Sequence, residues 1–234
     1  MSPEIGLGFE YITPNCYILQ TPCYIRSCNR VYHSSIPTDF EIETVKSLFG
    51  KKPFTWAVNN NHEEACSILE KHNLHSIGSF SAMSLHLSNL KLTHYNSNIL
   101  VQNINYNNEL IDTWINVVAK SFNVPDKELM AMLTFLSKKI TPGSLELYLA
   151  YHQGKPVSTC MVIKHNNTIA TLHWIATLPE FRNKGFGLAI THQVILATHA
   201  QGIQQLTLLS SAMGKSVYEK LGFTEDEIYK LYTI

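Results

Sequence analysis

The stretch Arg182-Asn-Lys-Gly-Phe-Gly187 decides how this sequence folds, because it joins a strand-like run to a helix-like run. Residues 168–177 before it are rich in β-branched and aromatic side chains, which is typical of a strand. Residues 188–200 after it are largely apolar, and Gly202 follows as a helix-ending residue. The first N–H groups of a helix lack internal partners and carry partial positive charge, and glycine lets an anion approach them. The sequence therefore predicts a strand–turn–helix unit that can hold phosphate; a plain turn is the alternative.

A second landmark follows one strand later. Residues 205–211 predict a strand, and residues 213–221 predict a short helix that Gly222 ends. Three apolar residues recur every four positions, and we expect them to form one buried stripe: Met213, Val217 and Leu221. Tyr218 lies one position off this stripe, so its hydroxyl can reach a cleft. An amphipathic residue at the edge of the core is the other interpretation.

Together these segments resemble the GCN5-related N-acetyltransferase (GNAT) superfamily, over about residues 97–234. The family's pyrophosphate loop, Arg/Gln-x-x-Gly-x-Gly/Ala between strand four and helix three, is matched by Arg182, Gly185 and Gly187. The family's Tyr-x-x-x-Gly-Phe segment on the next helix is matched by Tyr218, Gly222 and Phe223. The resemblance implies the α/β (α+β) GNAT fold, a mixed, mostly antiparallel central sheet flanked by helices.

The resemblance also implies acetyl-CoA as the acyl donor and a primary amine of a small molecule or peptide as the acceptor, which attacks the thioester directly. The loop amides would hold the pyrophosphate, and the pantetheine arm would pair with a strand edge opened by a bulge. A backbone N–H of that edge would polarise the acetyl carbonyl. The residues expected to bind acetyl-CoA are Ile175, Ala176, Thr177, Arg182, Asn183, Lys184, Gly185, Phe186, Gly187, Leu188 and Ser211.

Two proton-transfer residues are implied as well. Tyr218 matches the family's acid, which protonates the leaving thiolate. Many members carry a glutamate base on strand four, which aligns here with Thr171, and threonine cannot serve. His173 shares its face and has a suitable unperturbed pKa of about 6.5; a structural, cleft-lining histidine is the alternative. Glu146 is a further carboxylate near the expected sheet, and Glu180 is expected to be a solvated loop residue.

Other functions stay open. Without the strand-four glutamate, a non-catalytic acyl-CoA-binding or sensor protein of the same fold is the second hypothesis. A nucleotide-binding protein is disfavoured, because the loop lacks Gly-x-x-x-x-Gly-Lys-Ser/Thr. In this family the acceptor pocket is built mainly by the first two helices, here residues 109–142, which have no dense acidic cluster. A polycationic acceptor is therefore not favoured.

The order of elements supports two domains. From residue 98 onwards the patterns predict strand–helix–helix–strand–strand–strand–helix–strand–helix–strand, and the last strand covers residues 228–233. The N-terminal part predicts helices at 41–49 and 63–72 and strands at 54–58 and 79–87. It resembles a degenerate, smaller GNAT-like half without a glycine loop, so we expect no cofactor site there. An unrelated cap subdomain is the alternative. The predicted domains are residues 1–95 and 96–234, with a linker at 93–98.

Composition narrows the class further. The 234 residues are 45% hydrophobic and 15% charged with a formal net charge of zero, which suits a globular protein and argues against nucleic-acid binding. No long apolar run and no signal-like start occur, so we expect a cytoplasmic monomer or homodimer without membrane contact. Three of five cysteines lie within residues 16–28, but their spacing does not fit common zinc ligation, and we predict no metal. Cys160 is expected to be a buried structural thiol.

Overall fold

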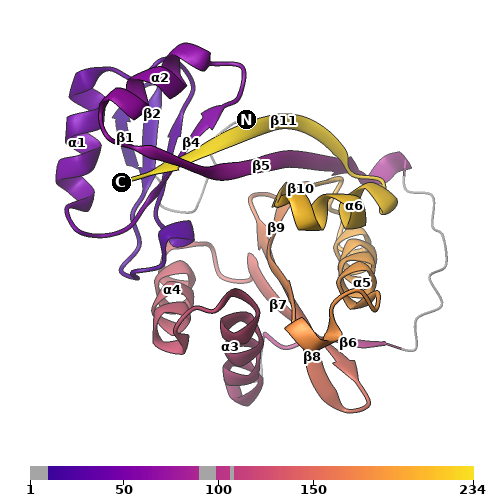
Figure 1. Cartoon of the computed structure of the whole chain (residues 1–234). Helices are drawn as coiled ribbons and strands as arrows, with labels where there is room; N and C mark the ends of the chain where they lie inside the picture. The colour runs from indigo at the N-terminus through magenta and orange to yellow at the C-terminus, as the bar shows by residue number, and fades with distance from the viewer. Residues whose placement is uncertain (1–9, 90–98, 106–107) are drawn as a thin grey trace. The chain divides into compact units, whose positions relative to one another are not determined.

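The computed structural model describes residues 10–89, 99–105 and 108–234 (Figure 1). Contacts divide the chain into two compact units, which we describe separately. Unit 1 comprises Met1–Ala82, Ala131–Ile140 and Glu225–Ile234, and unit 2 comprises Met83–Met130 and Thr141–Thr224. The predicted boundary at residues 95/96 and the predicted linker 93–98 lie outside the described residues, so this division into domains stays a prediction.

Unit 2 contains a mixed, mostly antiparallel sheet, as expected. Its strand order is β5-β10-β9-β8-β7-β6, and β9 and β10 are its parallel pair. The strands are β5 (His75–His86, of which Met83–His86 belong to this unit), β6 (Leu100–Asn103), β7 (Leu145–His152), β8 (Lys155–Lys164), β9 (Ile169–Thr177) and β10 (Gln205–Ser210). The helices are α3 (Asn108–Phe122), the start of α4 (Asp126–Lys139), α5 (Phe186–Ala200) and α6 (Ala212–Lys220), with short 3-10 turns η2 (Leu87–Asn89) and η3 (Pro179–Phe181).

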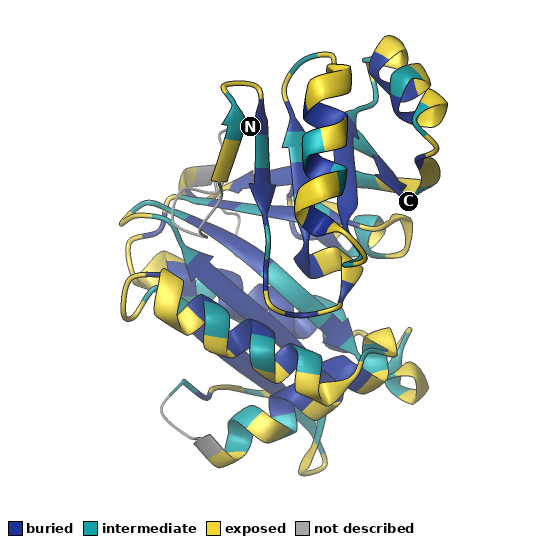
Figure 2. Ribbon diagram, turned by 90° about the vertical axis from the view of Figure 1, so that its left-hand side faces the viewer, coloured by how far each residue is buried: buried dark blue, intermediate teal, exposed yellow. Residues whose placement is uncertain are grey.

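Both faces of this sheet are buried. Cys160 and Val162 of β8 share a core cluster with Ile190 of α5, and the intervening Met161 of β8 is also buried. Since successive strand residues point to opposite faces, helices must cover both. Both α3 and α5 contact β7, β8 and β9. Figure 2 shows the result, strands coloured mostly as buried and helices with one exposed side.

Unit 1 is a second α/β unit. Its strand order is β1-β2-β3-β4-β11-β5, in which β3 and β4 are parallel and α1 connects them. Its elements are β1 (Glu10–Thr13), β2 (Cys16–Leu19), η1 (Arg26–Cys28), β3 (Arg30–His33), α1 (Asp39–Phe49), β4 (Thr55–Asn59), α2 (Glu63–Lys71), the later part of α4 and β11 (Thr224–Thr233). Trp56, Ile42 and Leu69 are fully buried in its core.

The predicted order of ten elements from β6 to β11 is confirmed. The expected stripe on α6 is confirmed for Leu221, which joins the core cluster of unit 2, and for Val217, which packs against it. It is wrong for Met213, which is 75% exposed, whereas Tyr218 is only 8% exposed and joins the cluster. Strands β1 to β3 were not predicted. Among the described residues, no helix is long and apolar enough to cross a membrane.

Candidate active site

The two parallel strands of unit 2 separate towards their carboxyl ends. Their ladder runs from Ile169 paired with Gln205 to Leu172 paired with Leu208, and β9 then continues to Thr177. The edge of β9 beyond Leu172 is therefore open on the side of β10. An extended ligand can pair with such an edge through main-chain hydrogen bonds.

A β-bulge lies at the start of this open edge. Thr159 of β8 pairs with Ala176 and Met161 pairs with His173, so β9 has one extra residue between the two pairs. Trp174 has the left-handed φ of 48°, which is rare for a residue with a side chain, and its carbonyl oxygen accepts a 2.9 Å hydrogen bond from the Thr159 hydroxyl. The bulged residues, Trp174 and Ile175, thus open the segment Ile175–Thr177 that is predicted to contact the pantetheine arm.

The glycine loop ends in a helix start without a side-chain cap. Asn183 and Gly185 have left-handed φ values of 60° and 83°, and Gly185 is the N-cap of α5. The first turn of α5 contains no acidic residue. A Cβ placed on Gly187 would lie 3.5 Å from Oγ1 of Thr177, so this helix start lies beside the end of β9. The first amides of α5 and the open strand edge therefore meet at one place.

The charged side chains of the loop, Arg182 and Lys184, form hydrogen bonds with main-chain carbonyl oxygens. The Arg182 guanidinium donates to the carbonyl oxygen of Thr177 at 3.2 Å and to that of Ser121 at 2.8 Å, which ties the loop to β9 and α3. The Lys184 ammonium donates to the carbonyl oxygen of Glu180 at 2.9 Å. Both residues are among those expected to bind acetyl-CoA, and that role stays a prediction. Two carbonyl oxygens engage the Arg182 guanidinium, whereas Asn183, Lys184 and Gly185 are the exposed residues of the loop.

Tyr218 lies on α6, in the core cluster of unit 2. Its ring packs edge-on against Phe223 at 6.0 Å, and a Cβ on Gly214 would come within 3.0 Å of it. Burial, with a smaller contribution from the Cys160 thiol, raises the pKa of Tyr218. Tyr218 therefore keeps its proton at neutral pH. The exposed Ser211 caps the same helix, since its hydroxyl accepts from the Gly214 N–H.

The candidate bases lie in different surroundings. The Thr171 hydroxyl contacts Nε2 of His165 at 2.6 Å and the Thr207 hydroxyl at 2.8 Å. His173, half-buried, precedes the bulge on the same face of β9 as Thr171. Sequence spacing missed the His165–Thr171 contact, which depends on the register of the β8–β9 hairpin.

The two carboxylates are not equivalent. Glu146 on β7 is 6% exposed and contacts the Lys164 ammonium at 2.5 Å and the Tyr148 hydroxyl at 2.5 Å. Its strand is separated from β9 by β8, so Glu146 does not reach the open edge. Cys160 is fully buried, and burial raises the pKa of its thiol, as expected for a structural cysteine. Glu180 is exposed on η3, as expected for a loop residue.

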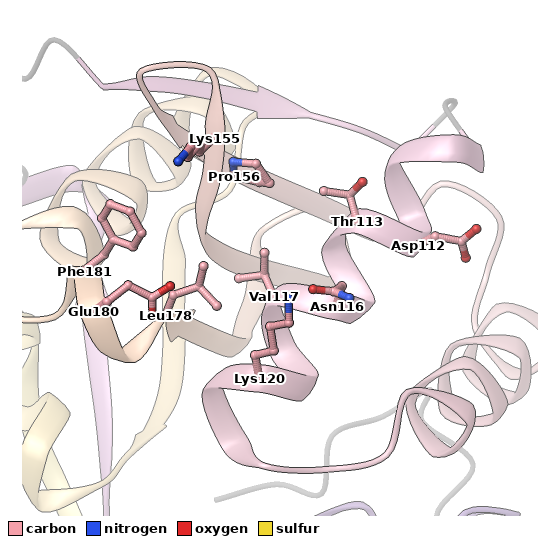
Figure 3. Close-up of a pocket in the computed structure, with 10 residues that line it drawn as sticks. All are labelled: Asp112, Thr113, Asn116, Val117, Lys120, Lys155, Pro156, Leu178, Glu180 and Phe181. Atoms are coloured by element: carbon pink, nitrogen blue, oxygen red, sulfur yellow. The ribbon is translucent and has the colours of Figure 1, made fainter.

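A pocket of about 660 Å³ adjoins the loop (Figure 3). Figure 3 shows α3 on one side and the start of β8 with η3 on the other. Its lining residues are Asp112, Thr113, Asn116, Val117, Lys120, Lys155, Pro156, Leu178, Glu180 and Phe181. The residues that line this pocket include neither Tyr218 nor His173. They do include Glu180, one of the two carboxylates considered as a base.

Known proteins share this sequence pattern and fold. Residues 143–225 match the model of the acetyltransferase (GNAT) domain. An uncharacterized acetyltransferase of Streptococcus pyogenes serotype M1 is 31% identical over 75 residues, 32% of this chain and 53% of that protein. A [ribosomal protein bS18]-alanine N-acetyltransferase of Haemophilus influenzae is 32% identical over 97 residues, 36% of this chain and 66% of that protein. The chain thus spans about half the length of the first of these curated relatives.

The fold likeness extends further than the sequence likeness. A GCN5-related N-acetyltransferase from Kribbella flavida superposes with a TM-score of 0.71 at 13% identity, over 97% of this chain and 91% of that one. The matched domain includes the bulged strand, the glycine loop and Tyr218, the same segments that form the site described above. On these grounds residues 143–225 belong to the acetyltransferase (GNAT) domain family, and the chain has the GNAT fold.

Proposed function

We propose that this chain is an acetyl-CoA-dependent N-acetyltransferase that acts on a primary amine of a small molecule or peptide. The observation that carries the proposal is the meeting of the open β9 edge with the start of α5, where Gly187 lies beside Thr177. Amides of a helix start favour phosphate, and a free strand edge favours an extended amide-containing chain. Acetyl-CoA carries both groups and supplies the acetyl thioester.

The residues fit such a donor. Asn183, Lys184 and Gly185 are exposed at the loop, and Phe186, Gly187 and Leu188 provide the first amides of α5. The N–H groups of Ile175–Thr177, which begin at the bulge, are proposed to pair with the donor and to polarise its carbonyl oxygen. Ser211, at the start of α6 beyond the end of β10, is proposed to bind the donor from the opposite strand.

Tyr218 is proposed to protonate the leaving thiolate. Its raised pKa keeps the hydroxyl protonated at neutral pH. His173 is proposed to accept the proton that the attacking amine loses, directly or through water. A polypeptide amine is one acceptor class to test, because a relative is named for the alanine of a ribosomal protein.

Calorimetric titration with acetyl-CoA tests the donor site, with Gly185→Glu as the disrupting variant. A matched control exists in Gly143→Glu, because Gly143 has a φ of 81° against 83° at Gly185, and neither position has a neighbour within 4 Å of an added Cβ. Both variants carry the same backbone strain and the same added charge. We expect saturable binding by the wild type and Gly143→Glu and its loss in Gly185→Glu. Absence of binding to the folded wild type would overturn the proposal.

The sensor hypothesis rests on Thr171, which stands where many family members have their glutamate. It predicts the same binding but no release of CoA with any amine. An amine-dependent release of free thiol, followed with a thiol reagent over a panel of peptide and small amines, distinguishes the two functions.

A further inference from the structure

Three side chains of unit 1 meet although they lie apart in the sequence. They are Cys16 on β2, His33 on β3 and Glu41 on α1, and they are 0%, 4% and 4% exposed. One potential metal-ligand atom from each lies within 4.8 Å of the other two. We call this group the Cys16–His33–Glu41 cluster.

The backbone of unit 1 builds this cluster. Cys16 and His33 are directly opposite each other in the antiparallel pair of β2 and β3, so their side chains point to one face of the sheet. Glu41 is the third residue of α1, and its carboxylate turns back to the helix start, where the backbone N–H and the hydroxyl of Thr38 each donate at 2.8 Å. The Thr13 hydroxyl donates to its other oxygen. The carboxylate is thus held in place independently of His33.

The His33 ring directs an unbonded nitrogen into the cluster. Its Nδ1 lies 2.7 Å from the carbonyl oxygen of Ser35, which only accepts, so Nδ1 carries the hydrogen. The Ser35 N–H, 3.3 Å from Nδ1, favours the opposite tautomer, but two acceptors at 2.7 Å would repel each other more strongly. Nε2 then carries a lone pair. It is buried, forms no hydrogen bond with the described residues, and lies 3.1 Å from Oε2 of Glu41. Two acceptors this close inside a core require a positive charge between them, which either a second proton on the ring or a metal ion supplies.

We propose that Cys16, His33 and Glu41 bind one Zn²⁺, with water as the fourth ligand. Thiolate sulfur, imidazole nitrogen and carboxylate oxygen are the ligands that zinc takes in proteins. Ligand atoms around tetrahedral zinc lie roughly 3.3–3.8 Å apart, given bonds of about 2.0–2.3 Å, so a pair at the 4.8 Å limit closes by about 1–1.5 Å on binding. Binding replaces the thiol hydrogen of Cys16, which leaves as a proton to solvent.

The other nearby cysteines take no part. The Cys23 sulfur contacts the Thr21 hydroxyl at 2.8 Å, and the Cys28 sulfur contacts the Met132 sulfur at 3.5 Å. A catalytic thiol is not the better assignment for Cys16, because its side chain is fully buried. The zinc instead joins β2 and β3 to the first turn of α1, so we assign it a role in stabilising unit 1.

Cobalt and zinc titrations of the reduced, full-length chain test this site. After treatment with a chelator and its removal, we expect one equivalent of Co²⁺ to give the near-ultraviolet absorption of a thiolate–cobalt bond, and Zn²⁺ to displace it. Cys16→Ser should abolish this absorption, and it should weaken Zn²⁺ binding by about 100-fold or more, measured against a chromophoric chelator. The matched control is Cys66→Ser, since Cys66 is a buried cysteine of the same core. It should bind like the wild type.

Zn²⁺ should also raise the unfolding temperature of the wild type and Cys66→Ser but not of Cys16→Ser. Circular dichroism identifies folded variants, and if Cys16→Ser is unfolded, Cys16→Ala takes its place in every comparison. A wild type without thiolate–cobalt absorption overturns the proposal. So does an unchanged absorption in the folded ligand variant.

Discussion

Each unit of this protein contains two parallel strands joined by a helix, and the two crossovers differ at the helix start. In unit 1, β3 leads through α1 to β4; in unit 2, β9 leads through α5 to β10. The start of α1 is closed by a capping box, in which Thr38 and Glu41 satisfy each other's backbone N–H groups. The start of α5 has Gly185 as its N-cap and no capping side chain.

The ladders differ in the same way. Every residue of β3 is paired with β4, from Arg30 with Thr55 to His33 with Val58. The ladder of β9 ends at Leu172, before the bulge at Trp174. In unit 1 the helix start is therefore capped and the strand is paired along its whole length, whereas in unit 2 the helix start is uncapped and the end of the strand is unpaired on that side. The capping residue and one extra strand residue make the difference, rather than the fold itself.

The largest expected effect is on turnover in unit 2. Tyr218→Phe should lower kcat by about 100-fold or more, because the thiolate loses its proton donor, and should change acetyl-CoA affinity by less than about threefold. Steady-state kinetics and calorimetry measure the two effects. Tyr229→Phe is the control, since Tyr229 is a partly buried tyrosine of unit 1 whose pKa is also raised by burial. Equal turnover of wild type and Tyr218→Phe would remove Tyr218 from the acid role.

A carboxylate introduced at Gly187 would give the first turn of α5 an acidic side chain, as the first turn of α1 already has. Gly187→Asp should weaken acetyl-CoA binding by about 30-fold, which corresponds to about 2 kcal/mol, because the new charge repels phosphate where the helix dipole attracts it. Gly187→Ala controls for the added Cβ, which meets Thr177 at an ordinary contact distance of 3.5 Å. Similar affinities of the two variants in calorimetry would contradict a phosphate site at α5.

A smaller effect is expected from single substitutions at the two helix starts, which should lower stability alike but differ in their effect on acetyl-CoA binding. Thr38→Ala removes the cap of α1 and Gly185→Ala strains a left-handed N-cap, so each should lower the free energy of unfolding by about 1 kcal/mol. We expect only Gly185→Ala to weaken acetyl-CoA binding. Urea unfolding and calorimetry on both variants measure this. Loss of binding in Thr38→Ala would show that the two helix starts are not independent.

The smallest expected effect concerns the pH dependence of kcat, which we expect to show no decline at moderately alkaline pH. Burial raises the pKa of Tyr218 above the ordinary value of about 10, so Tyr218 loses its proton only at a higher pH than a free tyrosine. At saturating amine, kcat should not fall between about pH 8 and pH 9.5. A decline with a midpoint below about pH 9 would mean that a different acid protonates the thiolate.

The sequence predicted the long elements of unit 2 well, because their patterns are local. Residues 182–187 already specify a tight turn before a helix, and Gly222, with a φ of 90°, ends α6 as expected. The pairing of Tyr218 with the glycine loop came from family resemblance and its role stays a prediction.

What the sequence did not show depends on contacts between distant residues. The stripe on α6 was wrong at Met213, because the face that packs against the core also includes Gly214, whose missing Cβ leaves room for the Tyr218 ring. Strands β1 to β3 are only four residues each, too short for a clear alternation. The two carbonyl oxygens that hold the Arg182 guanidinium come from β9 and α3, so only the fold shows these contacts.

The last strand of the chain has a consequence for biosynthesis. β11 pairs with β4 of unit 1, Tyr232 opposite Trp56 and Tyr229 opposite Asn59, although all of unit 2 lies between these paired residues in the sequence. Until β11 leaves the ribosome, β4 has an unpaired edge, which is a site for wrong association. The first half of this protein therefore cannot finish folding as it emerges. A chain cut short by ten residues would leave unit 1 incomplete rather than unit 2.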